Sequence, residues 1–438
     1  MSQAVGHREV LSAPNTTLSP GAGRVGLALM GVGAVLAVAG VGVAKAGIGG
    51  STLRQGLAAV HVGAMGVLGI CLSAMLFVMI FHLLNAGWTS TLRRQFENIM
   101  ALTPMAFGMV LAILAADIVL KGQLFAFLDP KQHGDVLLQK KWAYFFLPMH
   151  VPEAPATTTE FVPPVFWMIR AGFYGVFWWF LGGRLWKYSV EQDRSGDPWL
   201  SAQARRTSAW GVPILALTIA FASFDWLMAL DFRFFSTMFG VYFFAGATFA
   251  MFATMALIAT TLNRKGKLLG AVTEEHYHDL GKLLFIFACF WGYIAFSQYF
   301  LIWYSNIPEE TAYFTHRTHP NSVWRPLGVA LILGHFVLPF LFLMSRHVKK
   351  NRELFTLGAI LALGAHFLDM VFIIRPMTYV HDYGHPENMY GSPVVDVLGI
   401  LGVVVLFAGL LIRQMGSGPL LAAREPYLHE GLEHRNYV

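Results

Sequence analysis

Ten long apolar runs dominate the pattern of this chain. Each run is about 20 residues or longer, which is the length that an α-helix needs to cross the hydrocarbon core of a bilayer. The runs are continuous and do not alternate with a period of two, so they indicate helices and not the strands of a barrel. The predicted spans are 25–44, 56–84, 102–120, 164–187, 208–230, 235–262, 279–303, 324–345, 353–374 and 394–414. The pattern therefore predicts an all-α polytopic membrane protein with about ten transmembrane helices.

The segments between the runs leave no room for a soluble domain. The longest, 121–163, begins with aromatic residues that favour a short interfacial helix, and it ends in Pro, Thr and Glu residues that are typical of a loop. Residues 1–24 are polar and lack the features of a cleaved signal peptide, so the first span is expected to be retained. We divide the chain into this polar segment, a transmembrane domain over 25–414 and a cytoplasmic tail over 415–438.

Composition agrees with this division. Hydrophobic residues make up 56% of the 438 residues and charged residues 13%, and the mean hydropathy is +0.55, which is too apolar for a water-soluble globule of this length. Cys71 and Cys289 both lie inside apolar runs, and no CxxC or CxxCH motif occurs. We therefore expect no metal site, no covalently bound cofactor and no iron–sulfur ligands in this chain, and no nucleic-acid partner.

The basic residues predict an orientation. With the N-terminus inside, the inner connections carry 19 Lys and Arg residues and the outer connections carry nine. The positive-inside rule then places both termini in the cytoplasm.

Ionisable residues within or beside the spans are the candidate functional residues, because each is costly in hydrocarbon and usually faces a cavity or a partner. In the predicted topology most of them approach the outer face, which predicts a polar funnel opening outward with a sparse trail leading inward. We interpret the set as a proton path, made up of Asp117, Arg170, Asp225, Lys282, Glu309, Glu310, His335, His366, Asp369 and Asp396.

Several of these residues admit another interpretation. His366 and Asp369 share a helix face, so the carboxylate is expected to orient the imidazole. Asp117 and Arg170 equally fit a structural pair between neighbouring helices, whereas for Lys282 the favoured interpretation is a side chain that reaches the inner interface. A haem held by His335 and His366 is a weaker alternative, because a single pair of histidines is a weak signal.

The stretch "FSQYFLIWYSNIPEET" (296–311) ends one span in an unusual way. Trp303 and Tyr304 are typical of an outer aromatic belt, and Pro308 is expected to end the helix. Glu309 and Glu310 would then stand at the mouth of the funnel, where mutual repulsion favours uptake of a proton by one of them. A solvated loop that docks an extramembrane partner is the alternative.

Two stretches, "SFDWLMALDFRFFSTMFGVYFFAG" (223–246) and "FWGYIAFSQYFLIWYSNIPEET" (290–311), closely resemble the ActF-type subunit of alternative complex III, a bacterial quinol:cytochrome c oxidoreductase. The resemblance implies an NrfD-like fold, with two four-helix bundles (spans 2–5 and 6–9) flanked by spans 1 and 10. It also implies a subunit of the bacterial cytoplasmic membrane that has no redox centre and is not catalytic alone.

The same resemblance implies the partners. They are a paralogous NrfD-like subunit, an iron–sulfur subunit, multihaem and monohaem cytochrome c subunits, small membrane subunits and, as a further partner, a terminal oxidase. Haem c and iron–sulfur clusters are expected on those partners, and quinol or menaquinol is the implied substrate, for which no specific ligand residue is carried over. Two other classes stay open: a secondary transporter, which would need discontinuous helices in both halves, and a structural membrane scaffold, which would need the buried charges to pair with one another.

Overall fold

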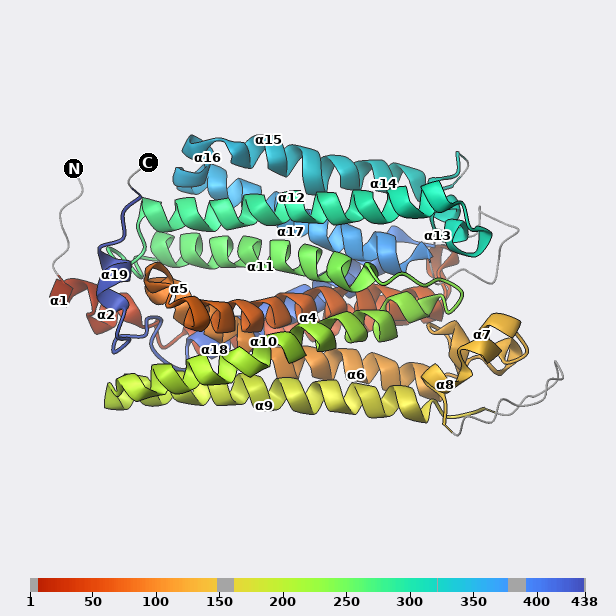
Figure 1. The fold of residues 1–438 in the computed structure, drawn as a ribbon, viewed down its shortest axis with the longest axis horizontal. Coiled ribbons are helices and arrows are strands. Elements are labelled where there is room, and N and C mark those ends of the chain that lie inside the picture. Colours follow the sequence, from red (N-terminus) through yellow and green to blue (C-terminus); the bar gives the residue numbers. More distant parts are fainter. Residues whose placement is uncertain (1–6, 148–160, 321, 377–390, 437–438) are drawn as a thin grey trace.

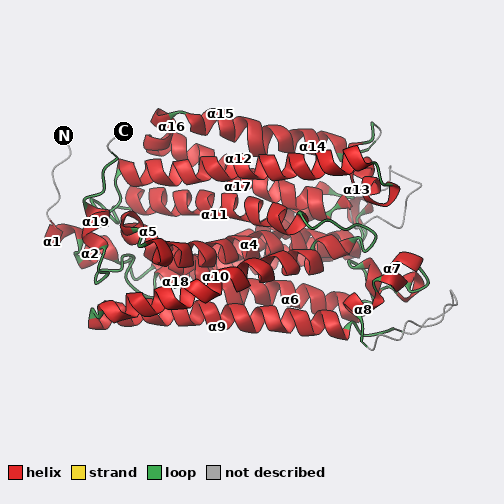
Figure 2. Ribbon diagram, viewed as in Figure 1, coloured by secondary structure: helices red, strands yellow, loops and turns green. Residues whose placement is uncertain are grey.

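The computed structural model describes residues 7–147, 161–320, 322–376 and 391–436, and this part of the chain is helical without any strand (Figures 1 and 2). It contains ten segments that are long and apolar enough to cross a membrane. They are α3 (Ala22–Lys45), α4 (Leu53–Leu84), α5 (Ser90–Met100) with α6 (Thr103–Val119), α9 (Val165–Ser195), α10 (Pro198–Trp226), α11 (Phe239–Arg264), α12 (Glu274–Ser305), α14 (Arg325–Leu331) with the π-helix η6 (Ile332–Val337) and α15 (Leu338–Met344), α17 (Arg352–Ile374) and α18 (Pro393–Met415). The predicted all-α polytopic fold is confirmed.

The long helices run side by side in two groups (Figure 1). One group contains α4, α6, α9 and α10, and the other contains α11, α12, α14 to α15 and α17. Helices α3 and α18 pack on each other and on α4, outside both groups. The grouping is the one that the resemblance implied, with α4 and α11 in contact at the centre.

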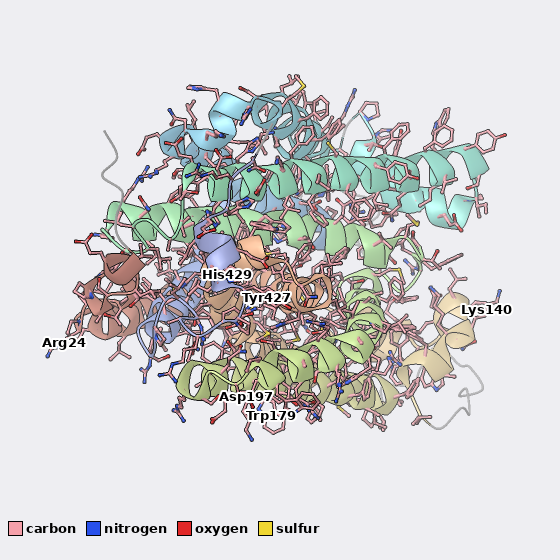
Figure 3. The ribbon with its side chains drawn as sticks, turned by 60° about the vertical axis from the view of Figure 1, so that its left-hand side comes forward. Arg24, Lys140, Trp179, Asp197, Tyr427 and His429 are labelled. Atoms are coloured by element: carbon pink, nitrogen blue, oxygen red, sulfur yellow. The ribbon has the colours of Figure 1, made fainter. Side chains whose placement is uncertain are left out.

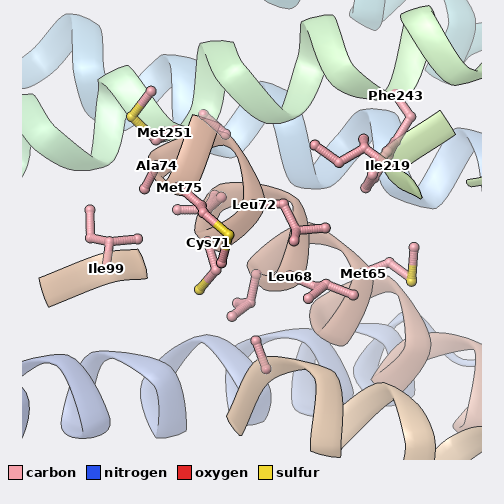
Figure 4. Packing of buried hydrophobic residues seen from close by; sticks show 14 of the residues in the cluster. Met65, Leu68, Cys71, Leu72, Ala74, Met75, Ile99, Ile219, Phe243 and Met251 are labelled. Atoms are coloured by element: carbon pink, nitrogen blue, oxygen red, sulfur yellow. The ribbon is translucent and has the colours of Figure 1, made fainter. Parts of the chain in front are cut away.

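Helix α4 is buried along most of its length because apolar side chains surround it on all sides (Figure 4). Met65, Leu68 and Met75 are fully buried and belong to the same hydrophobic cluster as residues of α5, α10 and α11. Cys71 lies in this cluster, where it packs as a small apolar residue. A helix that is apolar all round is typical of the interior of a helical membrane protein.

Short helices cover the two ends of the bundle. Both chain termini lie at one end, which we call the terminal end, and we call the opposite end the distal end (Figure 1). The terminal end carries α1 (His7–Val10), α2 (Ala13–Thr16), α16 (Arg346–Lys350) and α19 (Leu428–Leu432), and the distal end carries α7 (Val136–Lys140), α8 (Trp142–Phe145) and α13 (Pro308–Thr318). In Figure 3 the terminal end is turned forward, so that Tyr427 and His429 face the reader while Lys140 lies on the opposite side.

Two boundaries differ most from those predicted. Helix α10 begins at Pro198, ten residues before the predicted start at 208, because the Asp197 carboxylate accepts a hydrogen bond from the Trp199 amide and caps the helix. The predicted inner loop over 85–101 instead contains α5, whose residues are all buried. Both segments are too polar for an apolar pattern to extend through them.

Candidate functional site

The carboxyl group of Asp369 lies fully buried near the distal end of α17. Its Oδ1 accepts a hydrogen bond from the Tyr242 hydroxyl at the start of α11, and its Oδ2 accepts one from Trp291 Nε1 of α12 at 3.1 Å. Among the described residues no Lys or Arg forms an ion pair with it. Three helices of one bundle therefore meet at a carboxyl group that is held by two neutral donors.

His335 extends this cluster from the π-helix η6. Its ring stacks on the indole of Trp291, with centroids 3.8 Å apart and planes inclined by 26°. Neither ring nitrogen of His335 has a hydrogen-bond partner within the described ranges. The local cause of the π-helix is Pro339, which has no N–H to donate to the carbonyl group of His335 four residues earlier, so the regular ladder cannot form there.

His366 lies one turn before Asp369 on α17, but the predicted pairing of these two side chains is wrong. Tyr242 and Trp291 occupy the Asp369 oxygens, and the His366 ring faces α4, where a Cβ on Gly66 would lie 3.4 Å from His366 Nε2. Residues three apart on a helix are neighbours, yet donors on two other helices occupy the carboxylate oxygens.

Asp225 lies near the distal end of the fourth helix of the other bundle, as Asp369 does in its own, and its surroundings differ. Arg170 Nε and Nη2 donate to the two Asp225 oxygens at 2.9 and 2.6 Å, and the Tyr174 hydroxyl donates at 2.9 Å. The alternative pairing of Asp117 with Arg170 is therefore wrong, because Arg170 faces α10 and not α6. A bidentate guanidinium balances the Asp225 charge.

Two further carboxylates of the predicted path make contacts at the distal ends of helices. Asp117 accepts hydrogen bonds from the backbone amides of Leu124 and Phe125 at 2.7 and 2.9 Å, which fixes the turn after α6. Asp396, in the first turn of α18, pairs with Arg375 Nε at 2.7 Å. The first set of contacts fixes a described turn, and the second joins the end of α17 to the start of α18.

Lys282 lies near the terminal end, where its Nζ bonds to Asp279 at 2.8 Å and to Asn436 at 3.2 Å. Its side chain is 44% exposed, so it reaches the surface and not the bundle interior. This geometry fits the interfacial alternative for Lys282.

The glutamate pair begins a helix, contrary to the expectation that Pro308 ends one. Helix α12 stops at Asn306 in a left-handed conformation, and Pro308 then opens α13, where its missing N–H costs nothing. Glu310 is half-buried, and the side chain of Glu309 lies outside the described part of the structure. Glu310 and Tyr313 are three residues apart, so they occupy neighbouring positions on one face of α13.

Tyr313 joins the distal end of the cluster. Its ring lies under the buried Arg317 guanidinium at 3.6 Å, and Arg317 also donates hydrogen bonds to the carbonyl groups of Phe372 and Ile373 at the end of α17. Burial raises the pKa of nearby Asp231, and the positive charges of Arg233 and Arg317 oppose this shift. Tyr313, Arg317 and Asp231 thus form a polar layer over the Asp369 cluster at the distal end.

A cavity of about 850 Å³ lies beside the same cluster, between α12, α13, α14 and η6. Tyr242 and Trp291 line one part of it, and exposed side chains such as Phe296 and Ile332 line its lipid-facing side. Sequence reasoning missed this cavity. Its one signal was Gln298, a polar residue in the apolar run "AFSQYFL".

Sequence reasoning also missed a buried ion network at the terminal end. Glu97 of α5 accepts hydrogen bonds from Arg93 Nε at 3.3 Å and from the Ser189 hydroxyl at 2.6 Å, and it forms an ion pair with Arg94 Nε at 3.4 Å. Arg94 also pairs with Asp193, and Arg93 pairs with Glu425 in the tail. The i, i+4 spacing of Arg93 and Glu97 is the sequence feature that could have indicated a helix over α5.

Across the described ranges, no three His, Cys, Asp or Glu side chains lie close enough together to hold a metal ion. A scan against protein-family models finds no match, and a search of curated proteins finds no match either.

Proposed function

We propose that this integral membrane protein is a proton-conducting subunit of a quinol:cytochrome c oxidoreductase of the alternative complex III type. In this assembly it works beside a paralogous NrfD-like subunit, and the haem c groups and iron–sulfur clusters belong to other subunits. The likeness of 223–246 and 290–311 to ActF-type sequences supports the assignment of the complex. The geometry of Asp369 supports the assignment of the role.

The observation that carries the proposal is the contrast between Asp225 and Asp369. A buried ion pair is stabilised by its partner charge, as Asp225 is by Arg170. An ionised carboxylate without a cation at this depth costs several kcal/mol, and the cost disappears when the group takes up a proton. Asp369 therefore has the surroundings of a group that changes its protonation state, whereas Asp225 has those of a structural residue.

Neighbouring side chains supply a route toward the distal end. The Tyr242 hydroxyl contacts Asp369 directly, and Tyr313 of α13 lies in the polar layer above it. Glu310 lies one turn before Tyr313. Trp291 also contacts Asp369, His335 stacks on Trp291, and His366 is fully buried one turn before Asp369 on α17. Ordered water would be needed to join these groups, because they do not form one continuous chain of hydrogen bonds.

The test uses the assembled complex with Asp369→Asn. The amide keeps an acceptor for one donor but cannot carry a proton, so we expect quinol oxidation or proton release to fall by at least about tenfold. The control is Glu191→Gln, an exposed carboxylate on α9 near the terminal end. Subunit composition should match wild type in both variants. Wild-type turnover with wild-type proton stoichiometry in Asp369→Asn would remove Asp369 from the path.

Copurification tests the assignment of the complex. Affinity purification of the tagged chain from native membranes should recover multihaem cytochrome c and iron–sulfur subunits. A chain that purifies without them, or that oxidises quinol alone with a soluble acceptor, would contradict the proposal and favour a transporter or a scaffold.

A further inference from the structure

We propose that this chain also carries a lipid site: helices α9 and α10 bind the headgroup of an anionic phospholipid near the terminal end. The side chains of the site are Arg184 and Lys187 of α9 and Arg206 and Trp210 of α10, and all four are exposed. The predicted apolar runs of these helices meet the polar segment between them at residues 187 and 208, so the site lies where hydrocarbon meets water. The inference goes beyond the proposed function and does not depend on it.

The two arginines lie at the same level of the helix pair. Helices α9 and α10 pack side by side and are joined by a two-residue connection, so they run antiparallel (Figure 1). The Phe180 and Trp210 rings meet across this pair, with centroids 6.4 Å apart. Arg184 follows Phe180 by four residues, and Arg206 precedes Trp210 by four residues. The backbone positions of both arginines are therefore about 6 Å closer to the terminal end than the contact between the rings.

These cations have no carboxylate partner within the described ranges. Arg184, Lys187 and Arg206 are exposed, and none of them forms an ion pair there. By contrast, the exposed Arg264 at the end of α11, on the same terminal end, pairs with Glu353. Each unbalanced cation near a membrane surface strengthens the binding of anionic lipid about fivefold. Three such cations on one helix pair therefore favour a lipid with a net negative charge.

Aromatic neighbours hold both guanidinium groups at the surface. Arg184 Nε donates a hydrogen bond to the Tyr188 hydroxyl at 2.7 Å, and the guanidinium carbon of Arg206 lies 4.7 Å from the centre of the Trp199 ring. Among the described residues neither group makes a further hydrogen bond, so the two terminal nitrogens of Arg184 and the whole Arg206 fork remain available. Guanidinium N–H groups match the paired oxygens of a phosphate group.

An exposed apolar surface continues from the cations toward the distal end. Trp179 and Phe180 of α9 are 63% and 46% exposed, and Ile214 and Leu217 of α10 are 37% and 59% exposed. Side chains of this kind contact acyl chains in a bilayer, and Trp210 lies above them at the level where aromatic rings favour the interface. A row of cations over an apolar surface complements an amphiphile with a negatively charged head.

A zwitterionic lipid and an acidic protein segment are the competing occupants. The ammonium group of a zwitterionic head needs a carboxylate, and the exposed Glu191 of α9 lies one turn beyond Lys187. Three cations and this one carboxylate still leave two positive charges unbalanced. An acidic protein segment would balance them but would leave the adjoining apolar side chains uncovered. An anionic phospholipid meets both requirements.

The experiment titrates phosphatidylglycerol into phosphatidylcholine nanodiscs that hold the full-length chain. A photoactivatable phosphatidylglycerol is the probe, and mass spectrometry of the labelled peptides gives the mole fraction that half-saturates α9 and α10. Arg184→Gln and Arg206→Gln should each raise this mole fraction about fivefold, because each removes one unbalanced cation. Arg264→Gln is the matched control: it removes the same charge at the same end from a balanced pair, and should change the value by less than about twofold.

Further measurements separate a lipid site from other causes. Arg184→Lys combined with Arg206→Lys keeps both charges but removes the Arg184 bond to Tyr188, so the half-saturating mole fraction should stay within about threefold of wild type. Equal shifts in Arg264→Gln and in the two single glutamine variants would overturn the inference, since the charge of the whole terminal end would then attract lipid.

Three other results would also overturn it. A photoactivatable phosphatidylcholine that saturates the same peptides at the same mole fraction would show that the headgroup charge is not recognised. Displacement of the probe by soluble glycerol phosphate at constant ionic strength would identify a site for a free anion. Benzoylphenylalanine in place of Trp210 should crosslink to lipid in native membranes, and a protein adduct in its stead would identify a contact with a partner.

Discussion

Asp225 and Asp369 each lie near the distal end of the fourth helix of a bundle, and one guanidinium group distinguishes their surroundings. The sequence predicts that both residues lie near the same membrane face, since position along a helix follows from the span boundaries. It does not predict the rotation of each helix about its axis, which decides what each side chain meets. For this reason the alternative pairing of Asp117 with Arg170 was wrong although their depths agreed, and the contacts of Asp369 with Tyr242 and Trp291 were not predicted.

Asparagine substitutions at Asp225 and at Asp369 should lower the free energy of unfolding by different amounts. Asp225→Asn leaves the Arg170 guanidinium without its counter-ion and should lower the free energy of unfolding by about 3 kcal/mol. Asp369→Asn leaves no buried cation unpaired, so we expect a loss of less than about 1.5 kcal/mol. Thermal unfolding of the detergent-solubilised chain measures both, and equal losses would contradict the distinction.

His316 of α13 should make stability depend on pH. Burial, aided by the positive charge of Arg317, lowers the pKa of His316 to about 4 from 6.5. Between these values the unfolded chain binds more protons than the folded chain, so stability falls as pH drops from 6.5 toward 4 and is constant above 6.5. His316→Gln should flatten the fall in melting temperature over this window, and His429→Gln, on the exposed side of α19, serves as the control. An identical pH profile for His316→Gln and wild type would refute this assignment.

At the scale of helices, the apolar pattern predicted every membrane segment, because hydrocarbon demands a continuous run of about 20 apolar residues. Helix α5 and the first ten residues of α10 were not predicted, because both segments are polar. Ion pairs with distant segments stabilise α5, and the Asp197 cap stabilises the start of α10. The cavity beside α12 was not predicted either. Unfilled space is a property of how α12, α14 and η6 pack, and no single residue encodes it.

Helices α3 and α18 approach each other closely through glycines, and this contact is testable. A Cβ on Gly33 would lie 2.3 Å from the Leu406 backbone nitrogen, and one on Gly402 would lie 2.4 Å from the Ala37 nitrogen. Small residues let membrane helices pack backbone to backbone. Gly33→Val should therefore separate the pair and cost about 1–3 kcal/mol. Gly31→Val is a matched control on the same helix, because a Cβ there meets nothing within 4 Å. Similar losses in both variants would point to helix propensity as the cause.

At the scale of the whole molecule, the tail closes the terminal end of the first bundle. The Leu420 backbone amide donates to the Thr16 carbonyl at 2.7 Å, and the Leu420 carbonyl accepts from Gln95 Nε2 at 2.6 Å. Glu425 of the tail pairs with Arg93 of α5. The predicted tail over 415–438 thus forms part of the packed structure over its described residues. Sequence alone could not show this, because Arg93 and Glu425 are 332 residues apart and each is unremarkable in its own segment.

Removing this contact should loosen the tail. Glu425→Gln leaves the buried Arg93 with Glu97 alone, so we expect a loss of about 3 kcal/mol in stability and faster cleavage of the tail in limited proteolysis. Glu433→Gln, an exposed carboxylate eight residues later, should change neither. Equal protease resistance in both variants would show that the apolar contacts of Leu420 and Leu428 hold the tail without the ion pair.

The position of Glu425 in the chain also bears on how the protein is made. The ribosome delivers Arg93 to the membrane early, before eight of the ten spans are complete, whereas Glu425 leaves the exit tunnel after all of them. Until Glu425 is synthesised, the Arg93 guanidinium therefore has only Glu97 as a carboxylate partner within this pair of contacts. Closure of the terminal end therefore follows synthesis of the segment after α18, and it completes the burial of a charge that reached the membrane before most of the spans.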